Sequence, residues 1–150
     1  MEEMDIPGLL ARLETYRLGA IERVLAAQNG AVQLLLSLYF GSPVDVVLAE
    51  QTEAGGQIRR RARLMVRGAG QEACLARSII PLAANRPEVL DDVREGLLGL
   101  GQIVVKHRIP VQRQVKGIKV TGSQIARRDV MQGPGLHFAV TEVYPRELYR

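Results

Sequence analysis

The sequence predicts an α+β domain: an antiparallel sheet of about six strands with helices packed against it. Three observations predict this class. The length, 150 residues, suits one domain with a real core. Apolar residues make up 47% and charged residues 24%, the balance of a soluble globular protein. In the first part of the chain apolar residues recur at helical spacing. In the rest, polar and apolar residues alternate as in strands, with one predicted helix between them. We therefore treat residues 1–150 as a single domain.

Two helices are predicted at the start of the chain. Apolar residues recur at helical spacing over residues 9–27, and Asp5 can cap that helix. Asn29 and Gly30 end it. A second, shorter helix follows over residues 31–39.

The rest of the chain is predicted to be mainly strands. Glycine-rich turns separate most of the alternating segments, and a further helix is predicted over residues 86–98. The segments predicted as strands are residues 44–49, 58–66, 73–80, 103–105, 111–120 and 136–143.

Two charged residues interrupt apolar strand faces. Arg60 lies in an otherwise apolar row of its strand, and Glu142 does the same near the C-terminus. If these rows face the core, each charge needs a partner, because burying an unpaired charge is costly. One interpretation pairs the two residues with each other or relieves them at a sheet edge. The other is a closed pocket in which a cation and a carboxylate line an apolar wall, which suits a ring-bearing acid with a hydroxyl group.

The net charge of +4 is unevenly distributed. Residues 1–57 carry eight acidic and three basic side chains, whereas residues 96–128 carry seven Lys or Arg and no carboxylate. A basic half can bind nucleic acid or hold a small anionic substrate. The chain has no Trp and two Phe, so it supplies few platforms for base stacking. We therefore expect a small-molecule partner and no nucleic acid.

Other arginines have simpler interpretations. Arg59, Arg61 and Arg63 form a stripe on one strand face, which we interpret as a solvated face that discourages edge aggregation. By strand parity Arg77 points away from Ser78, and we interpret it as a structural ion-pair partner.

Several classes of protein are excluded by what the sequence lacks. One cysteine and two histidines 30 positions apart do not make a disulfide or a Cys/His metal centre. No apolar run reaches the roughly 18 residues of a membrane helix. The acidic start of the chain is unlike a targeting signal. We expect a cytoplasmic monomer with no metal, no cofactor and no membrane association.

Four segments together resemble one known family. They are residues 60–64 (RRARL), residues 76–81 (ARSIIP), the GLG turn at 99–101 after a helix, and the pair RR at 127–128 followed by TE at 141–142. The NGAVQ stretch at 29–33 adds a fifth piece. In this order, over roughly residues 25–145, they resemble the chorismate lyases, which convert chorismate to 4-hydroxybenzoate and pyruvate.

The resemblance implies a fold and a binding site. The fold would be a six-stranded antiparallel sheet with helices that enclose a small internal ligand cavity. Arg60 would hold the ring carboxylate, together with the backbone amides of Leu100 and of the region near Val32. Glu142 would contact the ring hydroxyl at the far end of the cavity.

The resemblance also implies a cofactor-independent elimination. Chorismate carries a second carboxylate on its enolpyruvyl ether, which a second basic residue should meet. The candidates are Arg127, Arg128 and Lys106, of which we favour Arg128. Arg60 and Glu142 would be the catalytic residues, and quinone biosynthesis is one pathway that would use the product.

A second function is compatible with the same architecture. Some transcription regulators use it as a non-catalytic domain that binds a small aromatic or sugar acid. Such domains usually follow a helical DNA-binding module, and the first 28 residues predict only one helix. We therefore expect the enzyme.

Overall fold

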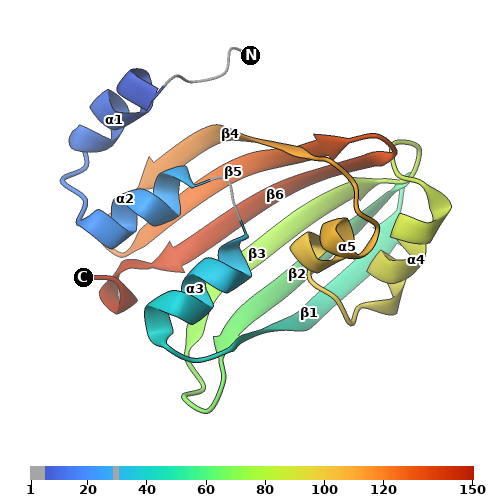
Figure 1. Ribbon diagram of the computed structural model, residues 1–150, viewed down its shortest axis with the longest axis horizontal. Helices are drawn as coiled ribbons and strands as arrows, with labels where there is room; N and C mark the ends of the chain where they lie inside the picture. Colours follow the sequence, from blue (N-terminus) through green and yellow to red (C-terminus); the bar gives the residue numbers. More distant parts are fainter. Residues whose placement is uncertain (1–5, 29–30) are drawn as a thin grey trace.

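A single six-stranded antiparallel sheet organises the molecule (Figure 1). The computed structural model describes residues 6–28 and 31–150. The strand order is β1-β2-β3-β6-β5-β4. The strands are β1 (Val44–Ala54), β2 (Gln57–Val66), β3 (Glu72–Pro81), β4 (Gln112–Val120), β5 (Gln124–Gly133) and β6 (Leu136–Pro145). The α+β class and the six antiparallel strands predicted from the sequence are confirmed.

The order of the strands follows from two meanders. Strands β1 to β3 pair in sequence, and so do β4 to β6. The two halves join where β3 pairs with β6. The central strands of the sheet therefore come from distant parts of the chain, and Ala76 faces Glu142 across the join.

Most of the helices cover one face of this sheet, whereas the first lies outside it, near the end of β4 (Figure 1). They are α1 (Ile6–Glu14), α2 (Ala20–Ala27), α3 (Val32–Phe40), α4 (Pro87–Glu95) and α5 (Leu100–Lys106). Helix α2 contacts β5, and α3 contacts β1 and β2. Side chains of β2 and β6 are alternately buried toward the helices and more exposed on the other face. None of the helices in the described part of the chain is long and apolar enough to cross a membrane.

The sequence predicts one helix over residues 9–27. This prediction is wrong, because the structure has two helices, α1 and α2, in that region. Arg17 adopts a left-handed backbone conformation with φ 52°, which ends the first helical segment. Gly19 then caps α2, and its N–H donates to Oε1 of Glu22 at 3.1 Å. The predicted cap at Asp5 and stop at Asn29 lie outside the described residues.

One predicted strand is wrong and one strand was missed. Residues 103–105 belong to α5, where Gln102 closes a capping box with the N–H of Gly99. The missed strand is β5, which carries Arg127 and Asp129 on its buried face. Those charges hid the alternation of polar and apolar residues that would have predicted β5.

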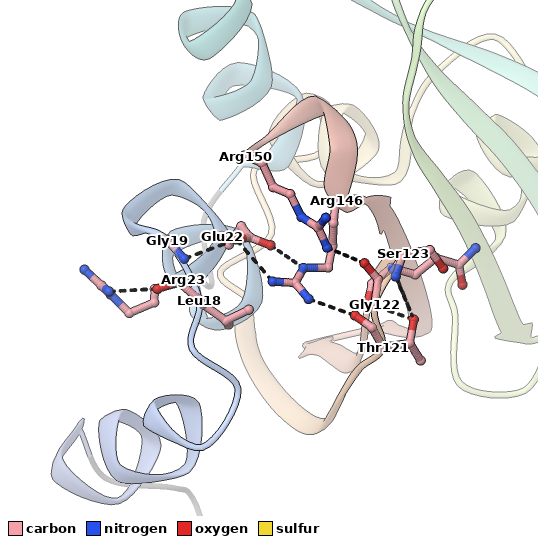
Figure 2. Close-up of polar contacts among 10 residues, drawn as sticks. Leu18, Gly19, Glu22, Arg23, Thr121, Gly122, Ser123, Arg146 and Arg150 are labelled. Atoms are coloured by element: carbon pink, nitrogen blue, oxygen red, sulfur yellow. Dashed lines mark hydrogen bonds and ion pairs between the residues drawn. The ribbon is translucent and has the colours of Figure 1, made fainter.

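A buried ion pair ties α2 to the end of the sheet (Figure 2). Oε2 of Glu22 accepts a hydrogen bond from Nε of Arg146 at 2.5 Å, and Nη1 of Arg146 donates to the carbonyl of Thr121 at 2.9 Å. Burial raises the pKa of Glu22, but the hydrogen bonds from Arg146 and Gly19 outweigh it, so the pKa is lowered overall. The helical layer is thus anchored at the C-terminal end of β6, next to the short 3₁₀ turn η1 (Arg146–Leu148).

The apolar core consists of two clusters along the covered face. One lies beneath α2 and α3 and includes Leu25, Leu36, Leu64, Cys74, Ile125 and Tyr144. The other lies beneath α4 and α5 and includes Ile58, Ile80, Val93, Ile103, Met131 and Phe138. The strip of sheet between the two clusters holds the polar residues described next.

Candidate functional site

A polar band crosses the covered face of the sheet between the two apolar clusters. Two neighbouring rows of paired residues make it up. The first row is Gln51, Arg60, Ser78, Val140, Asp129 and Val115, and the second is Leu48, Ala62, Ala76, Glu142, Arg127 and Ile118. Side chains at these paired positions share one face because they are in register.

Arg60 is buried in this band, and the residues that the structure describes give it no counter-ion. The residue is only 4% exposed to solvent. Nη2 donates to the carbonyl oxygen of Leu98 at 2.5 Å, whereas Nη1 has no hydrogen-bond partner. Among the described residues, no carboxylate forms an ion pair with Arg60. Burial lowers the pKa of Arg60, but an arginine stays protonated in a protein. The structure therefore holds a buried positive charge that its own side chains do not neutralise.

Glu142 is buried as predicted, but its partners differ from the predicted one. One oxygen accepts a hydrogen bond from Nη2 of Arg113 and lies 3.6 Å from Nε of Arg127. The other accepts from the hydroxyl of Tyr144 at 2.8 Å. The interpretation that Arg60 and Glu142 pair with each other is therefore wrong.

The charges around Glu142 balance one another. Asp129 accepts from Nη2 of Arg127 at 2.8 Å and from Nε of Arg113 at 2.9 Å. Arg127 also donates to the carbonyl of Leu25 on α2 at 3.0 Å. Two guanidinium groups thus face two carboxylates, the arrangement in which buried charges are tolerated. Arg113 was missed from the sequence because its strand shows no clear alternation.

Small side chains separate Arg60 from this network. Ala62, Ala76 and Ser78 occupy the positions between Arg60 and Glu142 on the same face. Two strand spacings and two residues along a strand put the Cα atoms of Arg60 and Glu142 about 12 Å apart. The surface of the sheet between the Arg60 guanidinium group and the Glu142 carboxylate is therefore made of small side chains. An enclosed cavity at this place remains a prediction.

The other predicted binding residues lie at the starts of two helices. Leu100 is the first residue of α5, two positions after the Leu98 carbonyl that Arg60 contacts. The guanidinium group thus lies near the end of α5 where backbone N–H groups lack helical partners. Val32 is the first residue of α3 and its side chain packs in the first apolar cluster. Both helices lie over the same face of the sheet (Figure 1).

Arg128 does not join Arg60 and Glu142. It is exposed, and it pairs in register with Thr141 on the face of the sheet away from the helices. Successive side chains of a strand point to opposite faces, so Arg127 and not Arg128 faces the band. Lys106, another candidate, pairs with Asp92 at 2.7 Å.

Asp92 joins the two helices that cover the second cluster. Its carboxylate accepts from Nζ of Lys106 at 2.7 Å and lies 2.5 Å from Nε2 of His107. Hydrogen bonds from Lys106 and His107 lower the pKa of Asp92. This contact holds the C-terminal end of α5 against α4. Within the described residues, no group of His, Cys, Asp or Glu is arranged to hold a metal ion.

Comparisons with known proteins show the fold. No protein-family model matches the chain, and no curated protein matches it. The chain is similar to the crystal structure of PhnF from Mycobacterium smegmatis, with a TM-score of 0.56 and 10% identity. The match covers 98% of this chain and 90% of that chain. This likeness supports a chorismate lyase-like fold.

Proposed function

We propose that the chain binds a small carboxylic acid in the polar band, with Arg60 as its anchor. One observation carries the proposal: among the described residues, the buried Arg60 guanidinium group has an unpartnered Nη1 and no carboxylate that pairs with it. A buried charge of this kind is costly unless something neutralises it. A ligand carboxylate would do so with two parallel hydrogen bonds.

The surroundings of Arg60 favour an acid with a ring. The side chains of Ala62, Ala76 and Ser78, between Arg60 and Glu142, are small. They would leave space above the sheet for the ring. The backbone N–H of Leu100, at the start of α5, would supply a further donor to the carboxylate. Glu142 at the other end of the band would accept a hydrogen bond from a ring hydroxyl.

The finer proposal is the chorismate lyase reaction. The ether C–O bond of chorismate breaks, a ring hydrogen ends on the methylene carbon of the enolpyruvyl group, and 4-hydroxybenzoate and pyruvate are formed. No oxidant or reductant is consumed. The protein would hold the reactive conformer, exclude water and stabilise charge on the departing group. Arg113, whose side chain is 10% exposed beside Glu142, replaces Arg128 as the cation for the pyruvyl carboxylate.

A non-catalytic binding domain is the second candidate. The hydrogen bonds of Glu142 favour a binding domain over an enzyme. One carboxylate oxygen already accepts a hydrogen bond from Arg113, and the other accepts one from Tyr144. A carboxylate held in this way is a poor general base. Such a domain would bind the acid through Arg60 and release it unchanged.

An incubation with chorismate separates these candidates. Pyruvate is followed with a coupled dehydrogenase and the aromatic product by chromatography. The variants are Arg60→Gln and, as a matched control, Arg63→Gln, which removes a charge from the same strand on its exposed face. Equal amounts of pyruvate and 4-hydroxybenzoate, lost only in Arg60→Gln, support the lyase.

The other outcomes are equally informative. No pyruvate, with a melting temperature that 4-hydroxybenzoate raises only when Arg60 is present, supports the binding domain. Turnover that persists in Arg60→Gln removes Arg60 from the site. A protein that neither turns over chorismate nor binds the product contradicts both candidates.

A further inference from the structure

The face of the sheet away from the helices carries a groove of about 480 Å³. It crosses the middle strands on the side opposite to the polar band. Its lining includes five arginines and one carboxylate, together with Ile79 and Thr141; the charged residues are Glu50, Arg59, Arg60, Arg61, Arg77 and Arg128. Arg60 borders the groove, but by alternation the side chains of Arg59, Arg61, Arg77 and Arg128 point to the face of the sheet opposite to the Arg60 guanidinium group.

Three of these arginines lie in one line across the sheet. Strand register places Arg61 beside Arg77, Arg77 beside Thr141, and Thr141 beside Arg128. Arg61 and Arg77 are direct cross-strand neighbours, and like charges at such positions destabilise a sheet. Arg77 and Arg128 are two strands apart, about 10 Å between their Cα atoms.

The charges of this line are not balanced. Arg61 lies 3.7 Å from Glu50, at the β1 end of the line. Among the described residues, no carboxylate lies within ion-pair distance of Arg77 or Arg128. The prediction that Arg77 is a structural ion-pair partner is therefore wrong. Within the described part of the chain, Arg77 and Arg128 thus face the groove without the acidic partners that a purely structural stripe would have, whereas Arg61 has Glu50 beside it.

The groove also offers contacts for the body of a ligand. Ile79 is 40% exposed on its floor and Thr141 supplies a hydroxyl group. The volume falls within the range of about 300–1,000 Å³ that small-molecule sites occupy. A second copy of this chain docked face to face would bring arginine against arginine, so the charges oppose that occupant.

We propose that this groove is a second binding site, for a small molecule that carries at least two acidic groups, phosphate or carboxylate. Arg77 and Arg128 would each hold one acidic group through paired N–H donors. Arg61 would strengthen the site, and Ile79 would contact the apolar part of the ligand. The site lies on the opposite face of the sheet from the Arg60 guanidinium group.

Calorimetric titration at constant ionic strength tests the proposal, with inorganic tripolyphosphate and citrate as the two probes. The variants are Arg77→Gln, Arg128→Gln and the matched control Arg63→Gln, an exposed arginine outside the groove on the same face of β2. We expect one probe per chain, with affinity about tenfold weaker in each groove variant. Binding should be unchanged in Arg63→Gln.

Either probe alone would suffice for support: a preference for tripolyphosphate assigns a phosphorylated ligand, and a preference for citrate assigns a polycarboxylate. The proposal is overturned if neither probe binds, or if Arg63→Gln weakens binding as much as Arg77→Gln, since only net charge would then matter. A single-stranded oligonucleotide that binds more tightly than both probes, with a steep salt dependence, would also overturn it.

Discussion

Replacing Arg60 with methionine should make the ligand-free protein more stable. Methionine keeps an unbranched stem and removes the guanidinium group. The wild type holds that group at 4% exposure, and within residues 6–28 and 31–150 it has one hydrogen bond, to the Leu98 carbonyl, and no paired carboxylate. The substitution therefore removes a buried charge that no carboxylate in the described residues neutralises.

The size of the effect can be worked from two opposing changes. Losing the charged hydrogen bond to Leu98 costs about 1.5–3 kcal/mol. Removing the desolvated charge returns several kcal/mol, and replacing even paired buried charges with apolar residues has stabilised proteins by roughly 1–4 kcal/mol. We expect Arg60→Met to raise the free energy of unfolding by about 2 kcal/mol. At about 2–4 °C per kcal/mol for a domain of this size, the melting temperature should rise by about 6 °C.

Arg127→Met is the matched contrast, because Arg127 is as deeply buried but is paired. Its guanidinium group bonds to Asp129 and to the carbonyl of Leu25. Removing one partner of a buried pair costs about 3–5 kcal/mol, so this variant should be less stable than the wild type. Urea unfolding and thermal unfolding at neutral pH measure both. An Arg60→Met protein that is less stable than the wild type by more than about 1 kcal/mol would refute the reasoning.

Two further predictions concern the contacts around the site. The hydrogen bonds from Lys106 and His107 lower the pKa of Asp92, so its contribution to stability is present above the ordinary value of 3.8 and is lost as the pH falls through the lower folded value. Asp92→Asn should therefore be less stable than the wild type at neutral pH, with the difference closing in acid; unfolding measured at a series of pH values checks this, and a difference that stays constant contradicts it. Tyr144→Phe removes the donor to Oε2 of Glu142, and leaving that buried oxygen unpaired should cost about 1–3 kcal/mol. A urea midpoint equal to that of the wild type would show that Glu142 does not depend on this hydroxyl.

The alternation of side chains along strands predicted the most useful part of the site. Arg60 and Glu142 each interrupted an apolar row, and both are buried, at 4% and 3% exposure. Parity within one strand is a local property, so the sequence contains it. The same rule separates Arg127 from Arg128, but only once β5 is recognised as a strand.

The partners of those charges could not be predicted in this way. Arg113 meets Glu142 from a strand two positions away in the sheet, and Arg127 reaches a carbonyl on α2. These contacts depend on strand order, and the sequence pattern does not contain it. The missed strand β5 has a related cause, since residues that pair their charges across the sheet look like exposed residues in the sequence.

The most direct test of the central claim compares 4-hydroxybenzoate with 4-hydroxybenzamide, which has the same shape and no charge. Calorimetric titration of the wild type and of Arg60→Met measures both affinities. If the buried Arg60 guanidinium group anchors a carboxylate, the acid should bind the wild type at least about tenfold more tightly than the amide. Arg60→Met should lose that preference. Equal binding of acid and amide by the wild type, or a preference that survives in Arg60→Met, would contradict the account.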